Sequence, residues 1–247
     1  MKKYISVFSV IARESMVKIS VLWVISAVLQ AVIFVREMVR GKANDSALIS
    51  YAFDLFDDKI GLPVVFGLTI IITGFLLMKT GMEFRTRTGY TLRRLRITER
   101  QAYVVQSVYN CFMLFMLFVF ETALCFFLVK WGTTRIDAKL LTSQTVYLTF
   151  YTTIFLKEIF AGRNIVMVIR NLFFIAAMGF NLSAFSYLWR RGSKYVFGVL
   201  VLVAAALLFI EGPDWGYVEN ITVTVVSVGI LLIAIGMVRS RRKEYDG

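Results

Sequence analysis

The chain has 247 residues, of which 58% are hydrophobic, and its mean hydropathy is +0.72. Soluble domains contain roughly 45–50% apolar residues, so this composition excludes an ordinary soluble domain and is typical of a polytopic helical membrane protein. The net charge is +12 and there is no histidine, which removes the commonest general base and metal ligand. The lysines and arginines lie beside long apolar blocks, which indicates a membrane partner and no nucleic acid.

The first segment, 1–16, has the pattern of an amphipathic helix. Its basic residues lie off an apolar stripe, which consists of Tyr4, Ile5, Phe8 and Ile11. The sequence predicts an interfacial helix on the inner leaflet that turns into the first span. A signal peptide is the competing interpretation, but Arg13 and Glu14 interrupt its apolar region and no small-residue cleavage site follows.

Six blocks are long or apolar enough to cross a bilayer, whose hydrocarbon core of about 30 Å requires about 20 helical residues. These blocks cover residues 17–35, 60–78, 103–129, 165–188, 195–210 and 221–238. The fifth block is short for a span. The sequence therefore predicts an all-α fold with one transmembrane domain over residues 1–247, six transmembrane helices and the N-terminal interfacial helix.

The charges flanking these blocks predict how the chain is oriented. If the N-terminus is cytoplasmic, most of the 28 lysines and arginines fall on inner segments and most of the acidic residues fall outside. This is the positive-inside bias, and the inner basic residues suit anionic phospholipid headgroups. We therefore expect a multi-pass protein of the cytoplasmic membrane with both termini in the cytoplasm.

An aromatic stretch within 140–163 is too short to span the bilayer. If it did span, every later segment would be inverted and the basic loops near residues 190 and 240 would lie outside. The charge bias rejects that arrangement. The segment is predicted to be an interfacial or re-entrant piece on the outer face.

The loop at 80–101 separates the second and third spans and contains a short, strongly basic amphipathic stretch. Its arginines surround an apolar ridge formed by Leu92, Leu95 and Ile97. Each arginine at the centre of a membrane helix costs about 2.5–3.5 kcal/mol on insertion scales, so this stretch is predicted to be exposed in the cytoplasm. The sequence Thr98-Glu99-Arg100-Gln101 fits a capping box, which predicts that a new helix starts at Thr98.

Two charged residues fall inside predicted spans. Glu121 lies about 12 Å and Arg170 about 8 Å inside the outer ends of the third and fourth spans, at 1.5 Å per residue. Because an intramembrane charge requires a partner or a wet cavity, the sequence predicts an interhelical ion pair between them. The alternative is that one or both line a translocation path.

Other residues in the spans suggest packing. Cys111 and Cys125 share one predicted helix at a separation of about 21 Å, which is too far for a disulfide. Gly179 on the fourth span and Gly229 and Gly236 on the sixth are small residues of the kind that allow close helix contact.

Motifs of energy coupling and catalysis are missing from the sequence. There is no GxxxxGK[ST] phosphate-binding loop, no G-x-S-x-G elbow and no metal-ligand cluster. We therefore expect that the chain is not an enzyme by itself and that it has no catalytic residue, metal site or bound cofactor.

The layout resembles the permease subunit of a type-2 ABC exporter. The most specific match is GYTLRRLRITERQAYVVQSVYN (Gly89–Asn110), which is similar to the family's TL-x-x-L-x-[VI]-[ST] segment before the third span. The stretch FSYLWRRGSK (Phe185–Lys194) resembles small members from Gram-positive bacteria. The resemblance covers most of the chain as architecture. One departure is that the long outer piece precedes the fourth span, whereas the family has it between the fifth and sixth.

This resemblance implies a coupling helix that docks on a separate ABC ATPase. Mapped onto this chain, the coupling residues are Tyr90, Leu92, Arg93, Arg94, Leu95, Arg96 and Ile97. It further implies a second permease copy or a paralogue as partner, with ATP and Mg bound by the ATPase. The transported substrate would be amphipathic or apolar and would move by alternating access.

Two other classes of protein remain open from the sequence. An ATP-independent carrier or channel would need more polar residues at mid-membrane and usually an internal repeat. An immunity or anchor protein would need no transport path. A P-loop ATPase that copurifies with the chain would distinguish the exporter from both.

Overall fold

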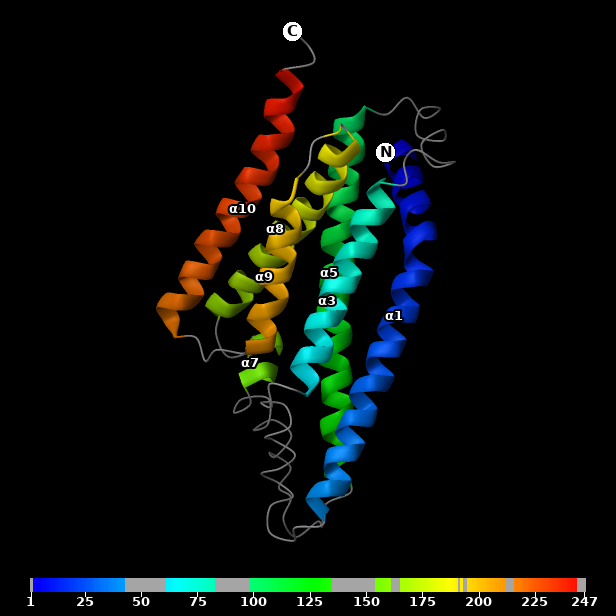
Figure 1. Ribbon diagram of the computed structural model, residues 1–247, viewed down its shortest axis with the longest axis vertical. Coiled ribbons are helices and arrows are strands. Elements are labelled where there is room, and N and C mark those ends of the chain that lie inside the picture. The colour runs from blue at the N-terminus through cyan, green and yellow to red at the C-terminus, as the bar shows by residue number, and fades with distance from the viewer. Residues whose placement is uncertain are drawn as a thin grey trace.

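A computed structural model describes residues 2–42, 61–82, 98–134, 154–160, 165–190, 192, 195–211 and 216–243. All regular structure within these ranges is helical, and they contain no strand. The all-α prediction is therefore confirmed for the part of the chain that the structure describes. The long helices lie side by side in an elongated bundle (Figure 1).

Except for α1, the helix boundaries agree with the predicted spans to within a few residues. The helices are α1 (Lys2–Lys42), α3 (Leu62–Met82), α5 (Glu99–Thr133), α7 (Ile154–Phe160), α8 (Ile165–Arg190), α9 (Phe197–Glu211) and α10 (Tyr217–Lys243). Five of them, α1, α3, α5, α8 and α10, are long and apolar enough to cross a membrane. They are compatible with a multi-pass membrane protein. In α9 the apolar stretch Phe197–Leu208 is shorter, and α7, at about 10 Å, is too short to cross.

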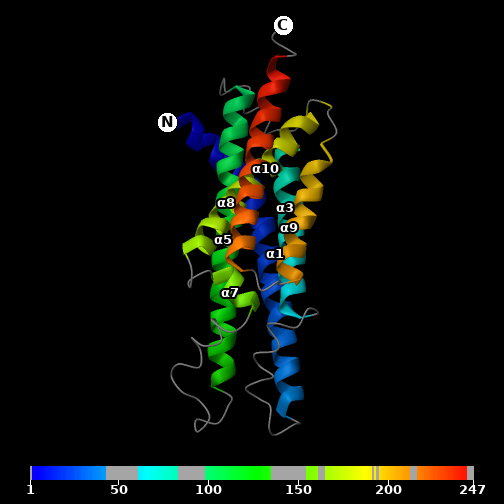
Figure 2. The same cartoon turned by 90° about the vertical axis from the view of Figure 1, so that its left-hand side faces the viewer.

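The N-terminal region differs from the prediction. The structure has one unbroken helix over Lys2–Lys42, so the predicted turn between an interfacial helix and a first span is wrong. The physical reason is local, because no glycine or proline occurs before Gly41 and nothing in this stretch interrupts the backbone hydrogen bonds. Figure 2 shows the first turns of α1 emerging to the side of α5.

The helices alternate in direction, which separates the molecule into two ends. The two chain termini, the end of α3, the start of α5 and the end of α8 lie at one end (Figures 1 and 2). We call this the basic end, because the helix ends there carry Lys79, Arg100, Arg190 and Arg239. The opposite end contains the end of α1, the starts of α3 and α10, and α7.

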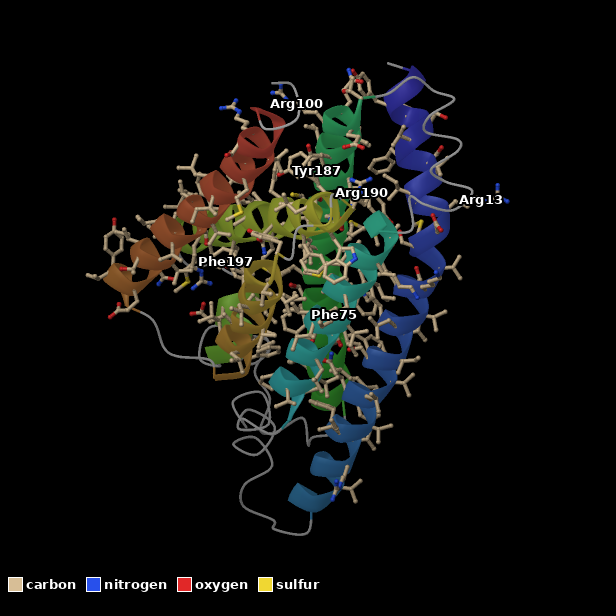
Figure 3. The ribbon with its side chains drawn as sticks, turned by 45° about the horizontal axis from the view of Figure 1, so that its top comes forward. Arg13, Phe75, Arg100, Tyr187, Arg190 and Phe197 are labelled. Carbon is tan, nitrogen blue, oxygen red and sulfur yellow. The ribbon has the colours of Figure 1, made fainter. Side chains whose placement is uncertain are left out.

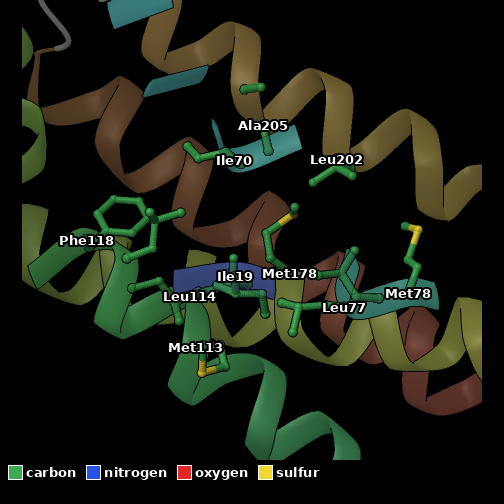
Figure 4. Packing of buried hydrophobic residues seen from close by; sticks show 14 of the residues in the cluster. Ile19, Ile70, Leu77, Met78, Met113, Leu114, Phe118, Met178, Leu202 and Ala205 are labelled. Atoms are coloured by element: carbon green, nitrogen blue, oxygen red, sulfur yellow. The ribbon is translucent and has the colours of Figure 1, made fainter. Parts of the chain in front are cut away.

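Helix α8 is at the centre of the packing. It contacts α3, α5, α9 and α10, while α1 packs on α3 and α5. Apolar side chains from five helices meet in one core, which includes Ile19, Ile70, Leu114, Met178 and Leu202 (Figure 4). This core fixes where polar side chains on α1, α3, α5 and α8 are brought together.

A proline marks the start of α3, and a glycine marks the end of α8. Pro63 stands in the first turn of α3, where its missing N–H is not needed and its fixed φ suits a helix start. Gly192 follows the end of α8 with φ of 76°, and its N–H donates to the carbonyl oxygen of Trp189 at 3.0 Å. This left-handed C-terminal cap lets the chain reverse toward α9.

Candidate functional site

Polar side chains from three helices gather deep inside the bundle. They come from α1, α3 and α5, and all are at most 4% exposed. We call them the Glu121 cluster, which consists of Ser26, Gln30, Thr69, Thr73 and Glu121. Because the helices around them are apolar, these side chains can hydrogen-bond only to one another and to the backbone.

Short contacts join Ser26, Gln30, Thr69 and Glu121, and Thr73 follows Thr69 by one turn of α3. Gln30 Nε2 donates to Glu121 Oε2 at 3.1 Å and to Ser26 Oγ at 3.3 Å. The Thr69 hydroxyl lies 2.8 Å from Ser26 Oγ. Three oxygens in the cluster have no hydrogen-bond partner, namely Gln30 Oε1, Thr73 Oγ1 and Glu121 Oε1. The cluster therefore has spare acceptors in a region where water is scarce.

The predicted ion pair between Glu121 and Arg170 is wrong. Glu121 contacts Gln30, as described above, and Arg170 NH1 instead forms a buried ion pair with Glu158 Oε2. Both residues are buried, at 0% and 3% exposed, so their placement inside spans agrees with the prediction. Glu121 and Arg170 lie at similar depths on helices that follow each other in the chain. They do not form an ion pair, because the two side chains face different neighbours.

Arg170 is held by side chains from three helices near the opposite end. We call this group the Arg170 cluster, which consists of Glu158 on α7, Arg170 and Asn171 on α8, and Asn220 on α10. Arg170 NH1 donates to Asn220 Oδ1 at 2.6 Å, and Arg170 NH2 donates to Asn171 Oδ1 at 2.9 Å. The cluster ties α7 and α10 to α8.

Sequence reasoning did not identify Glu158 as a buried partner. It lies in the segment predicted as interfacial or re-entrant, where a charged residue needs no explanation. The sequence pattern that could have indicated its burial is the group of apolar residues around it at helical spacing. Phe155, Leu156 and Ile159 are all buried in α7. Such a short helix packs only if its polar residue finds a partner inside.

A large groove lies at the basic end, between the first turns of α1 and α5 and the last turns of α8 and α10. Its volume is about 1410 Å³, and we call it the basic-end groove. Its walls are mostly apolar, and its lining includes Ile5, Phe8, Val104, Val108, Tyr187, Val238, Arg100 and Arg239. Figure 3 shows Arg100 and Tyr187 on this side of the molecule.

Three charged residues line the basic-end groove, namely Glu99, Arg100 and Arg239, and all three are exposed. No described residue forms an ion pair with either arginine. Arginine suits anionic groups because its guanidinium presents a fork of donors. The groove therefore combines mostly apolar walls with two arginines and one carboxylate, which leaves a net positive charge.

The start of α5 confirms the predicted capping box. Gln101 N–H donates to Thr98 Oγ1 at 3.3 Å, and Thr98 N–H donates to Gln101 Oε1 at 3.2 Å. Gln101 Nε2 also donates to the Tyr4 hydroxyl at 3.0 Å, which links the starts of α5 and α1. The predicted coupling residues at 90–97 lie outside the described residues.

Comparison of the chain with protein-family models, with curated proteins and with solved structures finds no match. The fold and the buried charges define a class, a helical protein compatible with several membrane crossings. Its function has to be argued from its own residues.

Proposed function

We propose that the chain is the membrane-spanning subunit of an ATP-driven exporter of the type-2 ABC kind. The observation that supports this most is that α3 ends and α5 begins at the basic end (Figure 1). The connection between them therefore starts and finishes on the side that the positive-inside rule assigns to the cytoplasm. That connection carries the basic, leucine-containing stretch similar to the coupling segment of the family.

In this proposal the membrane region has six spans. Five helices have the required length and apolar character, and α9 supplies the sixth crossing beside α3 and α8, which it contacts. The first turns of α1 lie on the inner leaflet as an extension of the first span, in agreement with the exposure of Tyr4 and Ile5. A second copy or a paralogue completes the transporter.

The capping box gives the proposed coupling a mechanical route. The segment 90–97 joins directly to Thr98, whose hydrogen bonds fix the first turn of α5. Gln101 on that turn also holds Tyr4 of α1. A displacement of the docked segment by ATP-driven closure of the ATPases is thereby passed to α5 and α1, which form two walls of the basic-end groove.

The groove also indicates the class of substrate. Valines, two arginines and the carboxylate of Glu99 line it, so its net charge is positive and an amphipathic molecule with a negatively charged group fits it best. Such a molecule enters from the cytoplasmic side or the inner leaflet and leaves when the helices rearrange. ATP and Mg are bound by the partner ATPase, and this chain binds neither.

The experiment that tests this function is purification of the tagged full chain from its native membranes in mild detergent. We expect an ATPase with a phosphate-binding loop to copurify and to hydrolyse ATP in the complex. Replacing Arg93 and Arg94 together by alanine should weaken the association most at low salt, and the difference from the wild type should shrink as salt increases, because exposed charges are screened. Recovery of the chain without any ATPase would contradict the proposal.

A second function, an ATP-independent carrier, is favoured by the Glu121 cluster. Buried polar side chains in the middle of a span are expected of a carrier and costly otherwise. The two functions separate in proteoliposomes that contain the chain alone. Uptake driven by an ion gradient without ATP would identify a carrier, and transport that requires the ATPase would identify the exporter.

A further inference from the structure

Two buried oxygens in the Glu121 cluster lack a hydrogen-bond donor although their side chains already touch. Gln30 and Glu121 are both 0% exposed, and one hydrogen bond joins Gln30 Nε2 to Glu121 Oε2 at 3.1 Å. The remaining oxygen of each side chain, Gln30 Oε1 and Glu121 Oε1, has no partner. If Glu121 is a carboxylate, both atoms are acceptors and neither can satisfy the other.

Among the residues that the structure describes, no lysine or arginine forms an ion pair with Glu121, and Arg170 is engaged by Glu158. The groups that face it are neutral: Gln30 from α1, and the buried thiol of Cys125 one turn along α5. The α3 side chain Thr69 reaches the cluster through Ser26. An ionised carboxylate in this environment is very costly.

We propose that Glu121 and Gln30 together form a proton-binding site. A proton taken up from water adds to Glu121 Oε1, and the resulting O–H donates to Gln30 Oε1. With Gln30 Nε2 still donating to Glu121 Oε2, the carboxyl and the amide share two hydrogen bonds. One added proton therefore removes the charge of Glu121 and gives both Glu121 Oε1 and Gln30 Oε1 a place in a hydrogen bond. No covalent bond in the protein is broken.

The orientation of the Gln30 amide does not change this result. Rotating the amide by 180° places its oxygen 3.1 Å from Glu121 Oε2, and two acceptors at that distance again require a proton between them. An alkali cation fits less well, because the Gln30 amide already presents a donor to the carboxyl group, and a cation is repelled by a donor hydrogen.

The hydroxyls of the cluster lie on one side of Gln30. Ser26 lies one turn before Gln30 on α1, and Thr69 from α3 contacts Ser26; because α1 begins at the basic end (Figure 1), Ser26 lies on the basic-end side of Gln30. The site belongs to a single chain and does not rest on the exporter proposal. Its test therefore needs no partner, and its failure would leave that proposal untouched.

The test is infrared spectroscopy of the purified full chain in lipid nanodiscs at neutral pH, where a protonated carboxyl has a C=O band distinct from that of a carboxylate. We expect one such band in the wild type, shifted by transfer to D₂O because its proton is labile. Glu121→Gln should lose the band. The matched control, Glu219→Gln, removes an exposed glutamate on α10 and should leave the band unchanged.

A second variant tests the role of Gln30. Gln30→Ala removes the amide that bonds the carboxyl group, so the band should move to higher frequency without disappearing. If Glu121→Gln does not fold, as judged by circular dichroism and size-exclusion chromatography, Glu121→Asp should shift the band instead.

A wild type with no protonated-carboxyl band would overturn the proposal, as would a band unaffected by these changes. A band seen only when sodium and potassium are replaced by choline would show that the site holds a metal cation.

Discussion

Arg170 is held in the bundle by contacts that no single helix could supply. Its guanidinium pairs with Glu158 from α7 and donates to Asn220 from α10. Asn220 in turn donates through Nδ2 to the carbonyl oxygen of Gly216 at 2.7 Å. The charge of Arg170 is thus neutralised and its donors are occupied, which are the two conditions for a buried ion pair to be tolerated.

Removing one partner of this pair should destabilise the protein more than removing both. Arg170→Met leaves Glu158 buried without its counterion, and we expect a loss of about 3–5 kcal/mol in the free energy of unfolding. The double variant with Glu158→Met should lose less than either single variant. Unfolding by denaturant in detergent micelles measures this, with Arg100→Met, at an exposed site, as control. Strictly additive losses would contradict the pairing.

For Glu121 and Arg170, the sequence predicted that the side chains are buried but did not predict which residues they contact. Glu121 and Arg170 were recognised as buried because each interrupts a long apolar block. Their partners depend on which direction each side chain takes around its helix axis, and on a short helix, α7, that brings Glu158 to Arg170. Depth along a helix fixes only one of the coordinates of a side chain.

Helices α5 and α8 approach each other closely at Gly179. A Cβ atom added there would lie 2.8 Å from the backbone nitrogen of Cys111, which cannot move aside like a flexible side chain. One turn further, Asn110 Nδ2 donates to Ser183 Oγ at 2.9 Å. The small residue and the interhelical hydrogen bond together favour the close contact of these two helices.

We therefore expect Gly179→Ala to destabilise the protein by about 1–3 kcal/mol through overpacking. Gly229→Ala is the matched control, because a Cβ there meets nothing within 4 Å and alanine is the better helix former. Thermal unfolding followed by circular dichroism gives both values. Equal effects of the two substitutions would show that the α5–α8 contact is looser than described.

The capping box should stabilise the first turn of α5. Thr98→Ala removes the acceptor of the Gln101 N–H, and its expected cost is about 0.5–2 kcal/mol. The measurement is amide hydrogen exchange in the first turn of α5, which should become faster. Thr222→Ala on exposed α10 is the control, since Thr222 only donates to a carbonyl of its own helix. Unchanged exchange after Thr98→Ala would mean that the cap does not hold this turn.

Among the elements, the sequence predicted helix ends best where a specific signal marks them. The capping box placed the start of α5 at Thr98, and the structure has the same cap. For α1 the change from mixed to apolar composition predicts a boundary, but composition alone does not break a helix. Gly229 and Gly236, predicted to allow close contacts, have open space around them in this chain.

At the scale of the whole molecule, the two ends differ in charge and in what they carry. The termini and the start of α5 lie at the basic end, and α7 with the Arg170 cluster lies toward the other (Figures 1 and 2). The charge bias of the sequence already predicted this grouping. The identity of any partner could not be deduced in the same way, because it depends on the surface of another molecule.

We expect the basic end to face the cytoplasm. Single cysteines at Ser240, on the exposed last turns of α10, and at Thr134, just after α5, report on the two ends. A membrane-impermeant maleimide applied to intact cells should label the cysteine at Thr134 and should not label that at Ser240. Labelling at Ser240 but not at Thr134 would invert the orientation.

The proposed function depends on the claim that residues 90–97 couple this chain to an ATPase. Eight residues are too few for a helix that is stable alone, so we infer that Leu92 and Leu95 need a partner's groove. Leu92→Asp with Leu95→Asp should therefore abolish copurification of the ATPase and stimulated ATP hydrolysis, while membrane insertion is retained. Thr86→Asp with Thr88→Asp adds the same charge outside 90–97 without removing the leucines, and should keep the ATPase. Copurification of an ATPase at the wild-type level with the leucine double variant would contradict the claim.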